Sequence, residues 1–321
     1  MIRYIGQRLL MMIPVILGIS FIIFSIMNLT KGDPARLILG EGATLEAIEA
    51  KREELGLNDA FIVRYAKYIA RVAIGDFGRS YRTDAPVSEE IFSRFPTTFY
   101  IAFLGILFAT LFAVPVGVIS AVKQYSAIDI ITTVVAMLLT SMPGFFVGML
   151  LILSFALMLR IFPATGIGTW RHFILPSLSV ASVTMANFIR MTRSTMLEVI
   201  RQDYVRTARA KGASMRRVIF THCLRNSLLP VVTVVGINFG VQLGGTIMIE
   251  AVFAIPGLGT YMINAIRQKD IPAVMGSVIF AAIVAGIINL AVDILYAYID
   301  PRVKSHYERF TKRGRRNAQR S

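Results

Sequence analysis

Seven basic side chains stand between residues 201 and 225, in a segment that lies between two long apolar stretches. They are Arg201, Arg206, Arg209, Lys211, Arg216, Arg217 and Arg225. Guanidinium and ammonium groups pair with carboxylates and phosphates, so the chemistry of such a group is charge-assisted binding. The apolar residues Ile200, Tyr204 and Ala208 recur every four residues, which places them on one face of a helix. This combination predicts a docking surface for a soluble partner, although such charges also occur in ordinary loops at a membrane face.

The residue sets that carry catalysis or bind metals are missing from the sequence. No lysine follows a glycine directly, so the chain has no P-loop of the form GxxxxGK[ST]. The three histidines, His172, His222 and His306, fit no metal-ligand spacing, and no HExxH, GxSxG or CxxC motif occurs. The single cysteine, Cys223, excludes a disulfide within the chain. We therefore predict that the chain alone is not an enzyme and binds no cofactor or metal of its own.

The elements that must position these residues are membrane-spanning helices. The chain is 55% hydrophobic with a mean hydropathy of +0.64, and it contains uncharged runs long enough to cross a bilayer. We count six such runs: Leu9–Leu29, Phe99–Val122, Ile130–Leu159, Phe173–Ile189, Asn226–Ile249 and Ile271–Val292. The first run is long for a signal peptide and no cleavage site follows it, so it is interpreted as a retained anchor. The third run contains Pro143 and should tilt, kink or overshoot the membrane.

The distribution of charge predicts the orientation of the chain. Six spans place both termini on one side, together with the loop formed by residues 190–225. That side carries 20 basic residues against five acidic ones, whereas the other side is nearly balanced. By the positive-inside rule, the termini and the loop face the cytoplasm, which explains most of the net charge of +15. The basic tail, residues 301–321, could bind nucleic acid, but contact with solvent or membrane lipid is favoured.

Residues 30–98 form one long insertion between predicted spans on the external side. Apolar residues recur in it at helical spacings from Leu45 to Ile69, among charges of both signs. We expect two or three short helices that form a small cap outside the membrane. The cap either closes the helix bundle or provides a surface for an external binding protein, and the pattern favours neither reading.

The polar residues deep in the predicted spans are uncharged. Asn187, Asn238 and Gln242 could line a translocation path, but each could equally bond between helices. The acids close to a span, Glu250 and Asp293, lie at predicted span ends. An ion-coupled carrier usually needs ionisable groups near the bilayer centre, so the pattern argues against such a carrier without excluding it.

Small residues four apart mark the fifth predicted span. Gly236, Gly240 and Gly244 form a GxxxGxxxG pattern. Glycines at this spacing allow helix backbones to approach closely in lipid. The pattern favours packing inside the bundle over a seam between two subunits.

Several separated segments, in the right order, resemble the permease subunits of peptide and nickel ABC importers, the DppB/OppB-type family. They are GDFGRSYRTDAPVSEEIFSRFPTT (75–98), RMTRSTMLEVIRQDY (190–204), YVRTARAKG (204–212), EAVFAIPGLG (250–259) and LYAYIDPRV (295–303). The resemblance covers most of the chain. It implies an all-α integral membrane protein with six transmembrane helices, in the fold of binding-protein-dependent (type I) ABC importer permeases, with a small helical extracytoplasmic insertion.

The same resemblance implies the partners and the cargo. A second homologous permease subunit, two ATP-binding cassette subunits and an extracytoplasmic substrate-binding protein would complete the transporter in a bacterial or archaeal cell membrane. ATP and Mg would be bound by the ATPase subunits, and no cofactor by this chain. Di- and oligopeptides are the implied cargo, with nickel, glutathione or another small solute as alternatives. A receptor-like membrane protein without substrate flux is the remaining alternative.

The resemblance also assigns roles to the basic loop, which corresponds to the coupling loop that enters a groove on an ATPase subunit. Ala208 and Gly212 match the alanine and glycine of the family signature, whereas Arg206 stands where the general signature has glutamate. The Leu-Pro pair of the signature is displaced to Leu229-Pro230, so we place docking in residues 203–217. The buried face of the coupling helix is expected from Tyr204, Val205, Ala208 and Gly212, ringed by Arg209, Lys211, Arg216 and Arg217. Asp203 is also assigned to the loop. These basic residues would pair with acids of the ATPase or with lipid phosphates.

The chain is thus predicted to divide into four parts. An N-terminal segment with the first helix (1–29) precedes the extracytoplasmic insertion (30–98). A five-helix permease core (99–300) includes the loop 190–225, and a basic cytoplasmic tail (301–321) follows.

Overall fold

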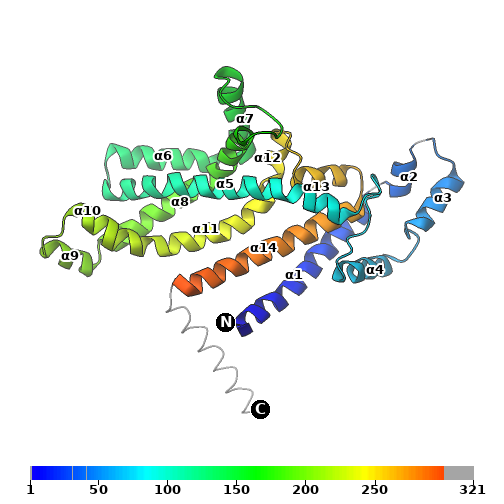
Figure 1. The fold of residues 1–321 in the computed structure, drawn as a ribbon, viewed down its shortest axis with the longest axis horizontal. Helices are drawn as coiled ribbons and strands as arrows, with labels where there is room; N and C mark the ends of the chain where they lie inside the picture. The colour runs from blue at the N-terminus through cyan, green and yellow to red at the C-terminus, as the bar shows by residue number, and fades with distance from the viewer. Residues whose placement is uncertain (1, 31, 41, 300–321) are drawn as a thin grey trace, which may run out of the picture. The chain divides into compact units, whose positions relative to one another are not determined.

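The computed structural model describes residues 2–30, 32–40 and 42–299, and these fold almost entirely into helices. The elements, shown in Figure 1, are α1 (Ile2–Leu29), α2 (Pro34–Leu39), α3 (Leu45–Glu54), α4 (Phe61–Ala73), α5 (Val87–Val122), α6 (Ala127–Ser141), α7 (Gly144–Leu151), the π-helix η1 (Ile152–Met158), the 3-10 helix η2 (Trp170–Phe173), α8 (Ile174–Ile200), α9 (Asp203–Ala210), α10 (Met215–Arg217), the π-helix η3 (Val218–Leu224), α11 (Arg225–Gly245), α12 (Ile247–Val252), α13 (Leu258–Arg267) and α14 (Ile271–Ile299). Four helices are long and apolar enough to cross a membrane, or up to six spans if each of two bent pairs counts as one. The prediction of an all-α membrane protein is confirmed, and the predicted tail 301–321 lies outside the described residues.

The residues group into two compact units. Among the described residues, unit 1 lies within 2–103, 148–176 and 243–286, and unit 2 lies within 104–147, 177–242 and 287–299. The long helices α5, α11 and α14 contribute residues to both units.

The core of unit 1 forms where α1, the first turns of α5, α13 and the start of α14 meet. Phe24, Ile91, Leu258 and Met275 represent these four elements in one buried cluster. Helix α4 packs against α1 (Figure 1), where the rings of Phe61 and Phe24 lie 5.1 Å apart between centroids. The insertion is therefore attached to the first spanning helix by aromatic contacts, which stabilise beyond the area that they bury.

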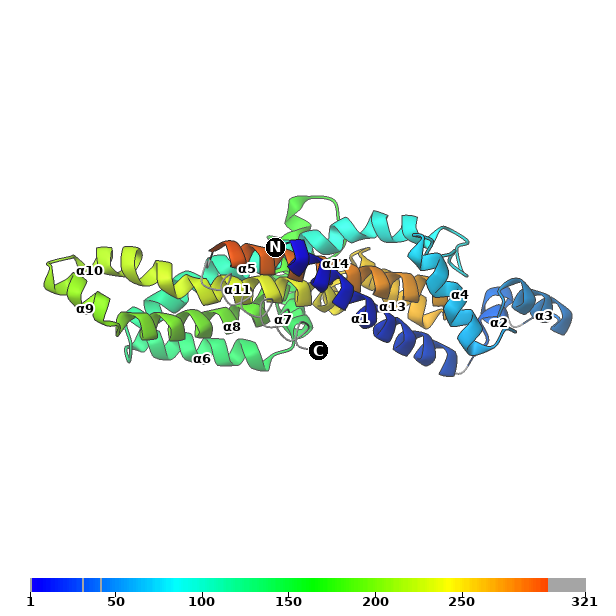
Figure 2. The ribbon, with the colours of Figure 1, turned by 90° about the horizontal axis from the view of Figure 1, so that it is seen from below.

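The core of unit 2 is rich in alanine, packed together with Phe188 and Ile189 of α8. Ala109 and Ala113 of α5, Ala136 of α6, and Ala181 and Ala186 of α8 are all fully buried in one cluster. Both views show α6, α8 and α11 running side by side (Figures 1 and 2). Helices in lipid associate through close packing rather than a hydrophobic drive, and small side chains allow that approach.

The long uncharged run from Ile130 to Leu159 is a broken element. Helix α6 ends at Ser141 and the next helical stretch, which begins at Gly144, is bent from it by 105°. Pro143 between them has no N–H for a helical hydrogen bond, and its ring clashes with a continuing helix. The kink predicted at Pro143 is therefore confirmed, and the run is not one straight crossing.

The insertion 30–98 contains three short helices, α2, α3 and α4, as expected. Helix α5 begins at Val87, inside the expected insertion, and continues into the uncharged run that starts at Phe99. Glu89 and Glu90 lie in the first turn of α5, where acidic side chains favour the positive end of the helix dipole. The charged residues before Phe99 therefore belong to the same helix as the apolar run. Position 98 marks a change in hydropathy within α5, and the helix does not begin or end there.

Candidate functional site

The segment after α8 folds as two short helices that meet at Gly212. Helix α9 ends at Ala210, and α10 begins at Met215 and continues through η3 into α11. Gly212 has a φ of +81°, a conformation that costs a residue with a Cβ about 1–2 kcal/mol. No atom lies within 4 Å of the position that a Cβ would take. Backbone conformation, and not lack of space, therefore requires glycine here.

The end of α9 has the hydrogen bonds of a Schellman motif. The Gly212 N–H donates to the Arg209 carbonyl at 2.9 Å, and the Ala213 N–H donates to the Ala208 carbonyl at 3.2 Å. Ala208 and Ala213 both pack against the same buried cluster, which is the apolar contact that accompanies this motif. The alanine at 208 and the glycine at 212 thus end the helix and turn the chain toward α10.

The apolar side of the segment packs inward. Val205 is 1% exposed and Val218 is 0% exposed. Both belong to a cluster with Val118 and Ala121 of α5 and Met196 of α8. Val205 therefore attaches α9 to its own chain and is not available to a partner, which corrects the expectation that it contributes to a docking face.

The other expected docking residues lie at or near the surface. The ring of Tyr204 is 42% exposed, and its hydroxyl accepts a hydrogen bond from Asn226 Nδ2 at 3.0 Å. Ala208 is half-buried, and the exposed members are Asp203, Arg209, Lys211, Gly212, Arg216 and Arg217. One aromatic ring and four basic side chains thus form a surface that can pair with carboxylates on another protein.

A buried ion pair lies behind this surface and escaped prediction. Arg193 donates from Nε to Asp129 Oδ1 at 2.7 Å and from Nη2 to Oδ2 at 2.8 Å. Asp129 also accepts hydrogen bonds from the Ser120 hydroxyl at 2.5 Å and from the Tyr125 N–H at 2.9 Å. The side chains of Asp129 and Arg193 are 5% and 29% exposed. The sequence offered no local signal, because the partners lie 64 positions apart and each resembled an ordinary charge at a span end.

A second buried carboxylate, Glu250, belongs to the EAVFAIPGLG segment in unit 1. It is 0% exposed, and it accepts hydrogen bonds from the Thr98 hydroxyl at 2.6 Å and the Thr260 N–H at 3.0 Å. Thr98 in turn accepts from the Leu258 N–H at 2.8 Å. A Cβ on Gly257 would lie 2.4 Å from Glu250 Cδ, so only glycine leaves room for the carboxylate. Burial raises the pKa of Glu250 above the usual range of a glutamate.

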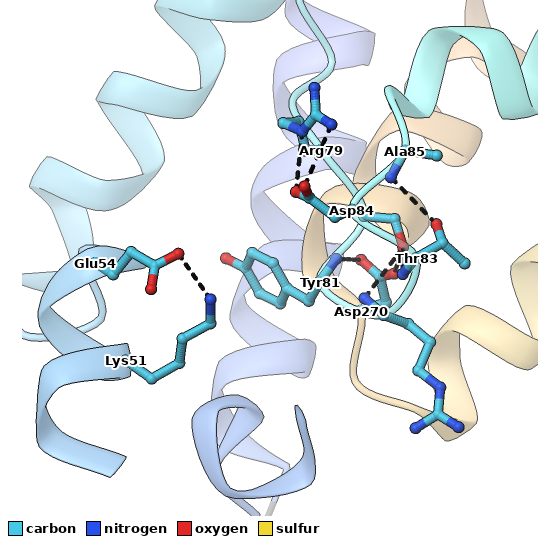
Figure 3. A network of polar contacts seen from close by, with 10 residues as sticks. Lys51, Glu54, Arg79, Tyr81, Thr83, Asp84, Ala85 and Asp270 are labelled. Carbon is cyan, nitrogen blue, oxygen red and sulfur yellow. Dashed lines mark hydrogen bonds and ion pairs between the residues drawn. The ribbon is translucent and has the colours of Figure 1, made fainter. Parts of the chain in front are cut away.

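A third polar node holds the hairpin that precedes α5 (Figure 3). The Ser80 hydroxyl donates to Asp270 Oδ2 at 2.5 Å, and the Tyr81 N–H donates to Oδ1 at 3.1 Å. Arg79 and Asp84 close the hairpin with an ion pair at 2.9 Å. Burial is the main reason that the pKa of Tyr81 rises to about 12, so the phenol stays neutral. Asp270 thus joins the insertion to the start of α14.

The three expected path residues make separate contacts. Gln242 accepts from the Thr184 hydroxyl at 3.0 Å and donates to the Val180 carbonyl at 3.2 Å, so it bonds α11 to α8. Asn238 donates to the Val234 carbonyl of its own helix at 2.7 Å. Asn187 accepts from Arg190 at 2.6 Å. Bonding between helices describes Gln242 well, and a role in a path remains a proposal for all three.

The glycines of the fifth span differ from one another. A Cβ on Gly236 would lie 2.3 Å from Val292 Cγ1, and a Cβ on Gly240 would lie 2.9 Å from Asn289 Oδ1. Both therefore pack against α14 of the same chain, as favoured. Gly244 has no neighbouring atom within 4 Å of its Cβ position, so it takes no part in this close approach.

Two family models match the chain. The model described as "Binding-protein-dependent transport system inner membrane component" matches residues 113–305, and the model of the corresponding N-terminal part matches residues 1–102. The chain belongs to this family. The first match contains residues 203–217 and the Asp129–Arg193 pair of this permease, and the second contains α1 to α4.

Curated relatives match this permease over nearly its whole length. The dipeptide transport system permease protein DppB of Alkalihalophilus pseudofirmus is 39% identical over 332 residues, covering 95% of this chain and 100% of that protein. The glutathione transport system permease protein GsiC of Salmonella paratyphi A is 40% identical over 304 residues, covering 95% and 99%. GsiC of Escherichia coli (strain K12) is 38% identical with the same coverage. The permease is therefore of the DppB type.

Solved structures agree on the fold. Two crystal forms that show inward-facing conformations of the MetNI methionine ABC transporter match with TM-scores of 0.54 and 0.56. The matches cover 63% and 66% of this chain and 93% and 96% of the solved chains, at 19% and 17% identity. The predicted fold of a type I ABC importer permease is confirmed.

Proposed function

We propose that this permease forms the translocation path of an ATP-driven importer for di- or oligopeptides, which an external binding protein delivers. The observation that carries the proposal is the similarity to DppB of Alkalihalophilus pseudofirmus, at 39% identity over 95% of this chain. The absence of a P-loop from the sequence fits a subunit that leaves ATP hydrolysis to others.

The surface of residues 203–217 would connect this permease to the energy source. Two ATP-binding cassette subunits would bind ATP and Mg, and one of them would receive α9 and α10 in a groove. The exposed Tyr204 would fill part of that groove, while Arg209, Lys211, Arg216 and Arg217 would pair with acids around it. A second homologous permease subunit would complete the path.

The orientation follows from the charges. The protein would lie in the bacterial or archaeal inner membrane with both termini in the cytoplasm, because the side that carries the termini has 20 basic and five acidic residues. Helices α2 to α4 would then lie outside the cytoplasm and face the binding protein.

Glutathione is a second candidate cargo, favoured by the 40% identity to GsiC of Salmonella paratyphi A. Glutathione is itself a tripeptide, so an amide backbone, a free amino group and terminal carboxylates are common to both cargoes. The path would need few changes to carry either.

A mild-detergent purification of the tagged permease, followed by mass spectrometry of its partners and an ATPase assay, tests the proposal. We expect an ATP-binding cassette protein and a second permease to co-purify, and the reconstituted complex to take up labelled dipeptide or glutathione when ATP is supplied. Ala208→Asp should remove the ATPase while membrane insertion stays normal, because a carboxylate at this half-buried position opposes the α9 contact. Recovery of the chain alone, with uptake driven by an ion gradient, would contradict the proposal.

A further inference from the structure

The Asp129–Arg193 pair joins three helices at one end of unit 2. Asp129 lies in the first turn of α6, Arg193 lies on α8, and Ser120 belongs to the last turns of α5. Each carboxylate oxygen of Asp129 accepts one hydrogen bond from Arg193 and one from another donor. A bidentate guanidinium–carboxylate pair fixes the orientation of both groups as well as their separation.

Helices α5 and α8 also approach each other closely beside this pair. A Cβ on Gly117 would lie 2.7 Å from Thr192 Cβ and 2.9 Å from the Ile189 carbonyl oxygen. Real Cβ contacts this short are essentially never seen, so the two backbones touch at this level. Thr192 directly precedes Arg193 in sequence, so α5 and α8 form one rigid pair at the position of the ion pair.

The docking surface rests on the same two helices. Val205 and Val218 pack on Val118 and Ala121, which flank Ser120 on α5, and on Met196, which lies one turn beyond Arg193 on α8. No described residue of α6 belongs to this cluster. At this end α6 is therefore tied to α5 and α8 by the ion pair and by the short turn that precedes it.

Net stability is a poor explanation for such a pair. Taking two charges out of water costs about as much as their attraction returns, and well-packed apolar residues at such sites are often no less stable. What the pair supplies is a fixed orientation between helices that can still move as a group. The pair fixes this orientation close to where Val205 and Val218 pack on α5 and α8.

We propose that Asp129 and Arg193 are positioning residues that make α6 follow the docking surface when that surface moves. The inference rests on the proposed function, in which the ATPase moves α9 and α10. Displacement of α9 is passed to α5 and α8 through the Val205 cluster and from them to α6 through the ion pair. Without the pair, the ATPase still moves α9, but the end of α6 at Asp129 follows only through the short turn after α5 and the packing of Ala136 on α5 and α8. Less substrate is then taken up for each ATP hydrolysed.

A distance measurement tests the mechanical part without any cargo or partner. Spin labels at Ile131 on α6 and Phe220 on η3, both exposed, report the separation of α6 from the docking segment in the purified full chain. We expect a narrow distance distribution in the otherwise unchanged protein and in Lys123→Gln, which removes an exposed charge from the same turn. Arg193→Lys, which keeps the charge and loses the bidentate geometry, should broaden the distribution. An equally narrow distribution in Arg193→Lys would overturn the inference.

Uptake and ATP hydrolysis in the reconstituted complex test the consequence. With labelled dialanine and labelled glutathione as probes, uptake per ATP hydrolysed should fall by about tenfold in Arg193→Lys and Asp129→Asn, a size typical of mutations that modulate coupling between sites. Hydrolysis itself should change little, and Lys123→Gln should match the unchanged complex. Unaltered uptake per ATP in Arg193→Lys, or failure of Arg193→Lys to assemble, would overturn the inference. If the unchanged complex takes up neither probe, the proposed function fails, while the spin-label result still decides the role of the pair.

Discussion

Asp129 and Glu250 are both buried carboxylates at the first turn of a helix, yet different kinds of groups hold them. Asp129 in unit 2 is bound by the guanidinium of Arg193, at 2.7 and 2.8 Å. Glu250 in unit 1 accepts hydrogen bonds from neutral donors, the Thr98 hydroxyl and the Thr260 N–H. Asp129 is thus stabilised by a charged side chain, whereas Glu250 is stabilised by close packing and by neutral hydrogen-bond donors.

The contrast matches what surrounds each acid. Asp129 bonds to Ser120, whose neighbours Val118 and Ala121 on α5 pack against Val205 of the proposed docking segment. A bidentate arginine keeps the orientation of both groups while the helices move together. Glu250 lies on α12, and Gly257 of the loop that follows leaves its carboxylate no room to move. We infer that the Asp129–Arg193 pair connects helices that move together, and that the contacts of Glu250 hold a part of unit 1 that stays rigid.

The largest expected effect is a difference in unfolding free energy between substitutions of the two acids, because only Asp129 leaves a charged partner when it is neutralised. Asp129→Asn leaves Arg193, 29% exposed, with a neutral partner, and loss of one member of a buried pair should cost about 2–4 kcal/mol of unfolding free energy. Glu250→Gln leaves only neutral donors and should cost about 1 kcal/mol. Chemical denaturation of the purified permease in detergent measures both. Equal losses would remove the distinction between the nodes.

The next effect tests the packing that surrounds Glu250. Gly257→Ala places a methyl group 2.4 Å from Glu250 Cδ, and the buried carboxylate is hydrogen-bonded and cannot yield, so the loss should be about 1–3 kcal/mol. Gly244→Ala is the matched control, because nothing lies within 4 Å of its Cβ position and alanine favours a helix by up to about 1 kcal/mol. If both variants unfold alike, the loop around Glu250 is not the rigid frame described above.

Substitutions at Gly212 test whether backbone conformation, and not steric contact, requires glycine in the segment between α9 and α10. Gly212→Ala should cost about 1–2 kcal/mol locally, because φ is +81°, and Gly212→Asn should cost less, since asparagine visits this region more readily. Gly212→Pro fixes φ near −65° and should abolish uptake while membrane insertion stays normal. Uptake by the reconstituted complex ranks the three. A ranking by side-chain size would contradict the backbone explanation.

The raised pKa of Glu250 predicts a pH dependence that Asp129 does not share. In the folded protein Glu250 holds its proton to a higher pH than its ordinary value of 4.5. Its contribution to stability is therefore complete below that value and is lost as pH rises through the folded pKa. The melting temperature of the unchanged permease should fall relative to Glu250→Gln as pH rises from the acidic range toward neutrality. Parallel curves would show that burial does not shift this group.

The sequence predicted features whose causes are local. The run that contains Pro143 is broken there, where proline offers no N–H for a helical hydrogen bond, whereas α1 and α11 continue through Pro14 and Pro230. The uncharged runs predicted the spans because a bilayer requires about 20 apolar residues for each crossing.

Features that depend on distant neighbours could not be predicted. Asp129 and Arg193 lie 64 positions apart, and each looked like a charge that only sets topology. Val205 is adjacent to Tyr204, and nothing in a single short helix decides which of two neighbouring faces turns inward. The start of α5 at Val87 was missed because a helix continues past the end of its apolar run when charged residues favour its first turn.

The smallest expected effect is that of Arg216→Lys, which is compared with the same substitution at Arg193. Arg216→Lys changes an exposed side chain and should alter unfolding free energy by less than about 0.5 kcal/mol, because surface charges contribute little on their own. It should also leave uptake per ATP unchanged, since its neighbours in the basic ring still offer charge to a partner. Arg193→Lys keeps the same charge but loses the two parallel hydrogen bonds to Asp129, so uptake per ATP should fall. A comparable loss in both variants would mean that positive charge alone matters at this end of the permease, and that the geometry of the buried pair contributes nothing of its own.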